Sequence, residues 1–365
     1  MTKIIKMSES KIDRKGIIYA ANQIKGGKLV VFPTETVYGI GASAFNEKAC
    51  KEIFKVKNRA VDNPLIVHIY SLDQLKEIAA VPANLFVVLR KVWPGPVTFI
   101  FKSINLPKMV TAGLDTVAVR MPSNKIALEL IKESDVPIAA PSANISTLPS
   151  ATEAKHAVAD FLGKVAVIID GGKSKFGLES TVVDVSRKPY RLLRPGSYDV
   201  NKLEKFLGKI KIPKSINETV KKGKVLSPGM KYRHYSPRKP LFLFDNVDGL
   251  ISASRFLESK GLKFAVLIPE EYKARVNSNR KIILGSIYEP EEIARNLFSS
   301  FRKLDEIDVE IGLISDIKLK SFDLAVRNRV IKASGENRVN NLKQFMDFIK
   351  SKLSSNQSFK NQIFN

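Results

Sequence analysis

The stretch VFPTETVYGIGASA, residues 31–44, decides how the first half of this chain folds. It begins like a buried strand and then changes to a proline, two threonines, an acid, a tyrosine and two glycines. A strand that only fills a core needs none of these residues. Because hydroxyl groups and a glycine-rich backbone can bind a small zwitterion, the stretch predicts one wall of a ligand pocket.

Short apolar runs alternate with helical patterns on both sides of this stretch. Runs rich in valine and isoleucine predict strands at 28–33, 64–70, 97–103, 116–122, 137–142, 166–172 and 180–186. Helical patterns occupy 46–59, 71–80, 124–135 and 151–163. This alternation predicts an α/β domain with a mixed, twisted sheet over residues 1–208.

Residues 209–240 interrupt that pattern. They contain ten basic residues against one acid, Glu218, and several prolines, which is typical of a linker. Beyond them, strand patterns return at 241–246, 264–270, 281–286 and 309–316, with helices at 252–260 and 289–306. We expect a smaller, Rossmann-like α/β domain over 241–345 and a polar tail over 346–365.

The composition bounds the class of protein. A net charge of +24 suggests polyanionic partners such as RNA or phosphorylated substrates, or else a lysine-rich proteome. One cysteine excludes an internal disulfide framework, and three scattered histidines argue against a zinc cluster. Without a long apolar run or a signal peptide, the sequence predicts a cytoplasmic protein without a membrane span.

Familiar catalytic motifs do not fit. Gly39-x-Gly41-x-x-Ala44 is spaced like a dinucleotide fingerprint, but six residues separate its first glycine from the strand. Gly172-Lys173-Ser174 lacks the earlier glycine of a P-loop. No serine lies in a nucleophile-elbow context, and a histidine inside an apolar strand, such as His68, is more often a core residue.

Four segments are more polar than their surroundings. Each one alone fits a solvated helix end, a capping turn or a solvent-facing strand position. Together they place cations, amides and hydroxyls at strand ends, where α/β sheets bind ligands. None is an obvious covalent nucleophile, which favours a reaction in which the protein positions its substrates and stabilises charge. The residues are Thr34, Thr36, Tyr38, Lys57, Asn58, Arg59, Asn63, Arg120, Ser142 and Asn144.

These segments resemble a known family. FPTETVYGIG, KNR followed by NPLIVH, VAVRMP, APSANIS, GLESTVVD and LRPG are similar, in order and spacing, to the YrdC-type domain. SPGMKYRHYSP at 227–237 resembles the linker of its two-domain members, the threonylcarbamoyl-AMP synthases. The resemblance is dense over about 15–240. Ala60 stands where members often have proline, and Thr147 where they often have glycine, so both departures concern loop geometry.

The resemblance implies a reaction. These enzymes condense L-threonine, bicarbonate or carbon dioxide, and ATP into threonylcarbamoyl-adenylate and pyrophosphate. A Mg²⁺ ion accompanies the ATP, and no protein side chain is expected to bind a metal. The product serves the threonylcarbamoyl-transferase machinery, which modifies position 37 of tRNA. Direct RNA binding is a further partner interaction that the basic charge allows.

The resemblance also implies site residues. Arg120 is expected to hold the threonine carboxylate, in a pocket lined by Thr34, Tyr38, His68, the Ala140 backbone and Ser180. The residues expected to act in catalysis are Lys57, Arg59, Ser142 and Asn144. The residues expected to contact ATP are Lys57, Arg59, Asn63, Thr116, Ser142, Asn144, Ser150, Arg194, His234 and Tyr235.

Two alternatives and one hypothesis accompany this interpretation. The main alternative is a non-enzymatic RNA-binding protein. A hydrogenase-maturation enzyme has a similar domain, but it needs paired Cys-x-x-Cys motifs that this chain lacks. The hypothesis is that the linker 209–240 covers the active site, with His234 or Tyr235 touching the nucleotide, because its prolines lower the entropy cost of ordering it.

Overall fold

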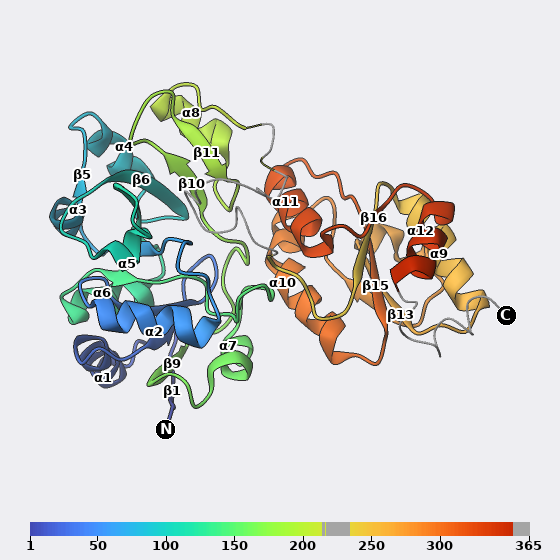
Figure 1. Cartoon of the computed structure of the whole chain (residues 1–365), viewed down its shortest axis with the longest axis horizontal. Helices are drawn as coiled ribbons and strands as arrows, with labels where there is room; N and C mark the ends of the chain where they lie inside the picture. Colours follow the sequence, from blue (N-terminus) through green and yellow to red (C-terminus); the bar gives the residue numbers. More distant parts are fainter. Residues whose placement is uncertain (214–215, 217–233, 353–365) are drawn as a thin grey trace. The chain divides into compact units, whose positions relative to one another are not determined.

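A computed structural model describes residues 1–213, 216 and 234–352 (Figure 1). The described part divides into two compact units. Among the described residues, the first contains 1–146, 150–213 and 216, and the second contains 147–149 and 234–352. Both units are α/β, which confirms the predicted fold class. Most of the predicted linker lies outside the described residues.

Within residues 1–213 the strands form one mixed sheet of eleven strands. Its order is β1-β9-β2-β3-β8-β4-β7-β6-β10-β11, and β5 pairs with β6. Parallel pairs such as β4 with β7 stand beside antiparallel pairs such as β6 with β7. The strands are β1 Lys3–Lys6, β2 Val30–Phe32, β3 Gly39–Ser43, β4 Ile66–His68, β5 Ala79–Ala80, β6 Val97–Ser103, β7 Thr116–Arg120, β8 Ile138–Ala139, β9 Val167–Asp170, β10 Thr181–Asp184 and β11 Arg191–Arg194.

The helices of the first unit begin at side chains that satisfy open backbone N–H groups. Asp13, Asn46 and Asn124 each accept a hydrogen bond from the N–H three residues on. Apolar faces of α1 and α6 then pack on β2 and β9 in one core. The helices are α1 Arg14–Lys25, α2 Glu47–Lys57, α3 Leu72–Ile78, α4 Leu85–Val92, α5 Lys108–Thr111, α6 Lys125–Ser134, α7 Ala154–Phe161 and α8 Val200–Leu207.

Strand β3 explains the two glycines of the opening stretch. It pairs antiparallel with β2 on one side and with β8 on the other. A Cβ at Gly41 would lie 2.5 Å from Ile138 Cγ2 and 2.8 Å from Phe32 Cε1. These glycines therefore allow β2, β3 and β8 to pack closely, and residues 33–38 form the loop between β2 and β3.

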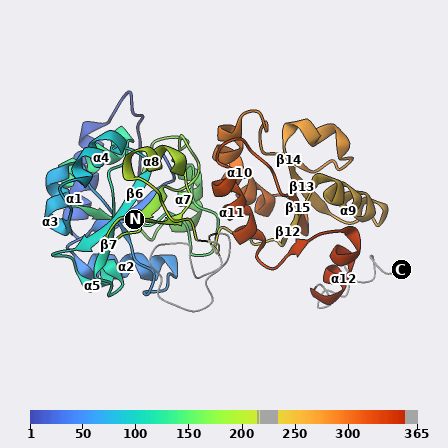
Figure 2. The same cartoon turned by 90° about the horizontal axis from the view of Figure 1, so that it is seen from above.

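Over residues 234–352, five parallel strands form the second sheet, in the order β14-β13-β15-β12-β16. Helices cover both of its faces, α9 and α12 on one and α10 and α11 on the other (Figures 1 and 2). This is the doubly wound arrangement expected of a Rossmann-like domain. The elements are β12 Leu241–Phe244, α9 Val247–Ser259, β13 Phe264–Ile268, the 3-10 helix Glu270–Arg275, β14 Lys281–Ile283, α10 Pro290–Glu306, β15 Ile311–Ser315, α11 Asp323–Ser334, β16 Arg338–Val339 and α12 Leu342–Lys352.

Helix α12 corrects the predicted end of the second domain. It continues to Lys352, into the stretch 346–365 that the sequence analysis assigned to a polar tail. The cause is the spacing of Phe345 and Ile349, which lie one helical turn apart and are buried in the core of the second unit. Residues 353–365 lie outside the described part.

Candidate active site

Three neighbouring strands of the first sheet, β4, β7 and β6, present one face to the candidate site. The strand register pairs His68 with Arg120 and, one row along, Ile66 with Ala118. Ala118 also pairs with Ile100 across β6. Because paired residues point to the same side of a sheet, these rows share a face. Ile66, Ala118 and Ile100 belong to a small apolar cluster beside the row that His68 and Arg120 form.

Arg120 is the charged member of this row. It is buried, with 4% of its surface exposed. Its Nε donates to the Gly95 carbonyl at 3.3 Å and its Nη1 donates to Thr36 Oγ1 at 2.7 Å. Its Nη2 lies 2.6 Å from Glu35 Oε1 in a buried ion pair. Three groups thus fix the guanidinium beneath the loop that joins β2 to β3.

That loop is organised by a hydroxyl. Thr34 Oγ1 donates to the Val37 carbonyl at 2.6 Å and accepts from the backbone N–H groups of Thr36 and Val37. It also lies 2.9 Å from Thr36 Oγ1. The side-chain turn places two threonine hydroxyls in a row that ends at Arg120.

Tyr38 anchors the end of this loop. Its hydroxyl donates to the Gly172 carbonyl at 2.6 Å and accepts from the Gly171 N–H at 3.1 Å. Burial raises the pKa of Tyr38 well above its usual value, so the phenol stays protonated. With both hydrogen-bonding roles taken by the segment after β9, Tyr38 supports the loop rather than offering a reactive oxygen.

His68 lies beside Arg120 and is neutral. Burial, together with the charge of Arg120, lowers its pKa to about 3. Its ring meets Phe32 edge-on, with centroids 6.2 Å apart. Among the described residues, none makes a hydrogen bond with His68 Nδ1. His68 can therefore contribute a polar atom to a pocket without adding a second positive charge.

Lys57 joins the end of α2 to the loop after β8. The side chain is 1% exposed, and its ammonium donates to the carbonyls of Ser142, at 2.6 Å, and Asn144. Ser142 Oγ donates to Asn144 Oδ1 at 2.5 Å. The structure thus brings together three of the residues predicted to act in catalysis, and Lys57 orders the loop that carries the other two.

Arg59 and Asn63 lie next to this cluster in the chain. Arg59 Nε donates to the Asn63 carbonyl at 3.2 Å and its Nη2 donates to the Pro64 carbonyl at 3.0 Å. These bonds close a short turn before β4. Asn63 is 2% exposed, and its Oδ1 has no hydrogen-bond partner among the described residues. An amide oxygen in that position is ready to accept a hydrogen bond from a ligand.

Ser180 and Arg194 come together at the start of β10. Ser180 Oγ lies 2.7 Å from Thr98 Oγ1, and Arg194 donates from Nε and Nη2 to the Ser180 carbonyl at 3.1 and 3.0 Å. Arg194 also pairs with Val182 across β11 and β10. The Ala140 N–H donates to the Ile66 carbonyl at 2.9 Å, so that donor is used in pairing with β4.

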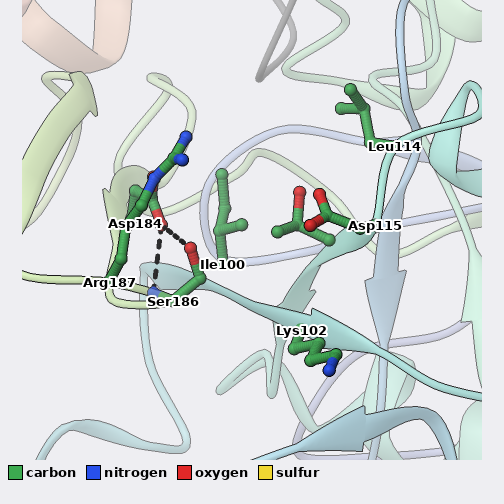
Figure 3. Close-up of a pocket in the computed structure, with 8 residues that line it drawn as sticks. Ile100, Lys102, Leu114, Asp115, Asp184, Ser186 and Arg187 are labelled. Atoms are coloured by element: carbon green, nitrogen blue, oxygen red, sulfur yellow. Dashed lines mark hydrogen bonds between the residues drawn. The ribbon is translucent and has the colours of Figure 1, made fainter.

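Other predicted residues lie apart from the Arg120 row. Ser150 is fully buried and donates to Glu179 Oε1 at 2.7 Å. Thr116 begins β7, four residues before Arg120 and on the same face, which places it about 13 Å along the strand. It lines a cavity with Ile100, Lys102, Asp115 and Asp184, where Ser186 donates twice to Asp184 (Figure 3).

His234 and Tyr235 are described within the second unit. Tyr235 is 5% exposed and has a positive φ of 65°. Its ring packs 5.1 Å from Phe298, and the Arg329 guanidinium lies 5.6 Å from its centroid. The contact of either residue with a nucleotide stays a prediction.

The sequence analysis missed Glu35, Thr98 and Glu179 as candidates. Glu35 and Glu179 are each 4% exposed, and Thr98 is fully buried. Glu35 had a signal, because an acid stood inside the stretch that predicted the pocket. Thr98 and Glu179 had none, since each is brought to the site by strand pairing or a loop contact.

Comparisons with known proteins agree with this fold and show the family. Residues 22–196 match a family model described as "Telomere recombination". Residues 198–335 match one described as "Threonylcarbamoyl-AMP synthase, C-terminal domain". A threonylcarbamoyl-AMP synthase from Pyrococcus abyssi is 45% identical over 346 residues, which cover 92% of this chain and 98% of that protein. The chain belongs to the threonylcarbamoyl-AMP synthase family.

Two further relatives support the assignment. A Bacillus subtilis threonylcarbamoyl-AMP synthase is 38% identical over 87% of this chain and 93% of its own length. The crystal structure of P. abyssi Sua5 complexed with L-threonine matches with a TM-score of 0.85 at 41% identity, over 93% of this chain and 99% of that one. Family membership makes the chain an enzyme of the nucleotidyltransferase class and favours that interpretation over the non-enzymatic RNA-binding alternative.

The described residues include neither a membrane-spanning helix nor a cluster of metal-binding side chains. No helix in that part of the chain is both long and apolar enough to cross a membrane. No group of three or more histidine, cysteine, aspartate or glutamate side chains there could hold a metal ion.

Proposed function

We propose that this enzyme condenses L-threonine, bicarbonate or carbon dioxide, and ATP into L-threonylcarbamoyladenylate and pyrophosphate. The observation that carries the proposal is the buried Arg120, held by Thr36 and Glu35 beside a neutral histidine on the sheet face. This receptor suits a small amino acid. The P. abyssi relative, solved with L-threonine, supports threonine as that amino acid.

Arg120 binds the threonine carboxylate in this proposal. A guanidinium is permanently charged and forms strong paired hydrogen bonds with a carboxylate. Around it, the Thr34 and Ser180 hydroxyls, the His68 ring and the Ala140 backbone line the pocket, with Tyr38 supporting the loop. In this proposal the polar end of threonine contacts Arg120, and its methyl group contacts the neighbouring apolar cluster.

The second cationic group faces the nucleotide. Lys57 and Arg59 lie at the end of α2, with Asn63, Ser142 and Asn144 held beside them. Arg194, Ser150 and Thr116, together with His234 and Tyr235, are proposed to contact ATP more peripherally. Mg²⁺ enters as the ATP complex, held by phosphate oxygens and water, which is how this ion usually binds at nucleotide sites.

The chemistry requires positioning and charge stabilisation. The threonine amine adds to carbon dioxide and loses a proton, which gives a carbamate. A carbamate oxygen then attacks the α-phosphorus of ATP, and pyrophosphate leaves. Because negative charge builds up around the phosphorus, nearby cations and hydrogen-bond donors lower the barrier.

The product is an activated acyl group that a second enzyme must consume. We propose that it serves the threonylcarbamoyl-transferase machinery that forms threonylcarbamoyladenosine at position 37 of tRNA. The cytoplasm, which the sequence predicts as the location, supplies both ATP and tRNA.

Pyrophosphate release tests the proposal. Purified enzyme with ATP, Mg²⁺, threonine and bicarbonate should release pyrophosphate, and omission of threonine or bicarbonate should abolish the signal. Turnover of ATP that is indifferent to threonine would refute the synthase activity. RNA binding without any turnover would instead support the non-enzymatic alternative.

A further inference from the structure

The ion pair between Glu35 and Arg120 is unusual for a buried pair. The side chains are 3% and 4% exposed, and Glu35 Oε1 lies 2.6 Å from Arg120 Nη2. Among the described residues, none forms an aligned hydrogen bond with either carboxylate oxygen of Glu35 or with Arg120 Nη2. The two charges are therefore adjacent, but both oxygens of Glu35 and the Nη2 group of Arg120 are without a hydrogen bond among the described residues.

Burying such an ion pair destabilises the folded protein unless further hydrogen-bond donors satisfy the carboxylate. A carboxylate has about four acceptor positions, and burying them without donors destabilises the folded protein. A buried ion pair offsets its desolvation only when further hydrogen bonds satisfy both partners. Arg120 has two of these, from Thr36 and Gly95, whereas Glu35 has none. The missing partner of Glu35 is a group with several N–H or O–H donors.

We propose that Glu35 binds the ammonium group of the amino-acid substrate, so that Glu35 and Arg120 together recognise a zwitterion. The inference rests on the proposed function, because it takes threonine as the ligand of Arg120. An α-ammonium and its carboxylate are separated by a single carbon, and the two receptor charges are likewise adjacent. The ammonium supplies three donors, the group that Glu35 lacks.

The pair then determines specificity. A ligand with a carboxylate but no ammonium would place a second negative charge beside Glu35 and leave its oxygens without donors. Like charges at such distances repel strongly in a buried site. The enzyme should therefore reject (R)-3-hydroxybutyrate, which is threonine without its amino group, even though Arg120 could bind its carboxylate.

The test compares these two ligands by calorimetry on the full chain. In the Glu35→Gln variant, threonine binding should weaken about tenfold, because a neutral amide replaces the charged acceptor. Binding of (R)-3-hydroxybutyrate should improve, so the preference for threonine should fall by about a hundredfold in total. Asp184→Asn is the matched control, since it neutralises another buried carboxylate of this sheet, one that Ser186 satisfies, and it should leave the preference unchanged.

A second variant guards against loss of folding. Glu35→Asp keeps the charge on a shorter side chain, so it should bind threonine less tightly yet still reject (R)-3-hydroxybutyrate. If Glu35→Gln binds threonine as tightly as the unmodified enzyme or more tightly, Glu35 is only a counter-ion that the substrate displaces, and the inference is wrong. An unmodified enzyme that binds no threonine would instead overturn the proposed function.

Discussion

His68 lies inside β4 next to Arg120, and its burial makes stability depend on pH. Its pKa is lowered to about 3, against an ordinary value of about 6.5 in the unfolded chain. Below pH 6.5 the unfolded chain binds a proton that the folded enzyme does not, so stability falls as the pH drops toward 3. We expect His68 alone to cost roughly 2 kcal/mol of unfolding free energy between pH 6.5 and 5.

The His68→Gln variant isolates this contribution. Urea unfolding of both proteins at pH 7.5, 6.5 and 5 should show that the variant loses less unfolding free energy as the pH falls, whatever its stability at pH 7.5. Parallel pH profiles would mean that His68 is protonated in the folded enzyme, contrary to its burial beside a guanidinium.

Thr147 occupies a backbone conformation that suits glycine. Its φ is 78°, in the left-handed region that β-branched residues rarely adopt. Thr147→Gly should relieve this strain and stabilise the enzyme by about 1 kcal/mol, which corresponds to a rise of about 2 °C in Tm. The neighbouring Ser146→Gly is the control, because it adds only chain flexibility and should lower Tm. A fall in Tm for both variants would show that position 147 is unstrained.

At the level of single residues, the sequence supplied the polar side chains of the pocket but not their pairing. Arg120 and Thr34 were found because a charge inside a strand and hydroxyls after one are conspicuous. Glu35 was overlooked because its partner, Arg120, lies in a distant strand. The role of Lys57 as a tie between α2 and the Ser142 loop likewise depends on a tertiary contact.

Among the elements, β3 is held by close packing at Gly41. A Cβ there would lie 2.5 Å from Ile138 and 2.8 Å from Phe32, on the two neighbouring strands. Gly41→Ala should therefore destabilise the enzyme by about 1–3 kcal/mol through overpacking. At Gly39 the nearest atom, Phe32 Cζ, is 3.2 Å away, so Gly39→Ala should cost less. Urea unfolding checks the order, and equal stability of the two variants would contradict it.

The elements that sequence patterns predicted are those with a strong apolar signal. Strands β6 and β7 and helices α2 and α6 fall where valine-rich runs and amphipathic spacing placed them. Strand β3 was missed because two of its residues are glycines, which strand patterns disfavour. Helix α1 was missed because three of its five buried residues, Gly16, Ala20 and Ala21, are small and weaken the apolar contrast.

For the whole molecule, the unexpected feature is that residues 147–149 belong to the second unit. These residues follow the Ser142 loop in the chain but belong to the second unit. The Ser236 N–H donates to the Thr147 carbonyl at 2.8 Å, and the Arg302 guanidinium donates to the Pro149 carbonyl at 2.7 Å. Sequence patterns place domain boundaries at linkers, so they cannot predict that a short segment within one domain's sequence range belongs to the other unit.

A truncated chain tests what each unit contributes. The cut has to follow residue 213 rather than 208, because Lys211 exchanges backbone hydrogen bonds with Tyr190 and Leu192 beside β11, and Ile210 is buried. We expect residues 1–213 to fold cooperatively and to be more stable than residues 1–208 by about 3 kcal/mol.

The same truncation separates binding from turnover. Residues 1–213 keep Arg120, Glu35 and the pocket loop, so threonine affinity measured by calorimetry should stay within about threefold of the full chain. They lose Ser236 and Arg302, which hold the carbonyls of Thr147 and Pro149 just after the Ser142 loop. Because that loop is proposed to face ATP, a looser loop should lower pyrophosphate release by at least about tenfold. Full turnover by residues 1–213 would show that the second unit is dispensable for the reaction, whereas loss of threonine binding would place part of the amino-acid pocket beyond residue 213.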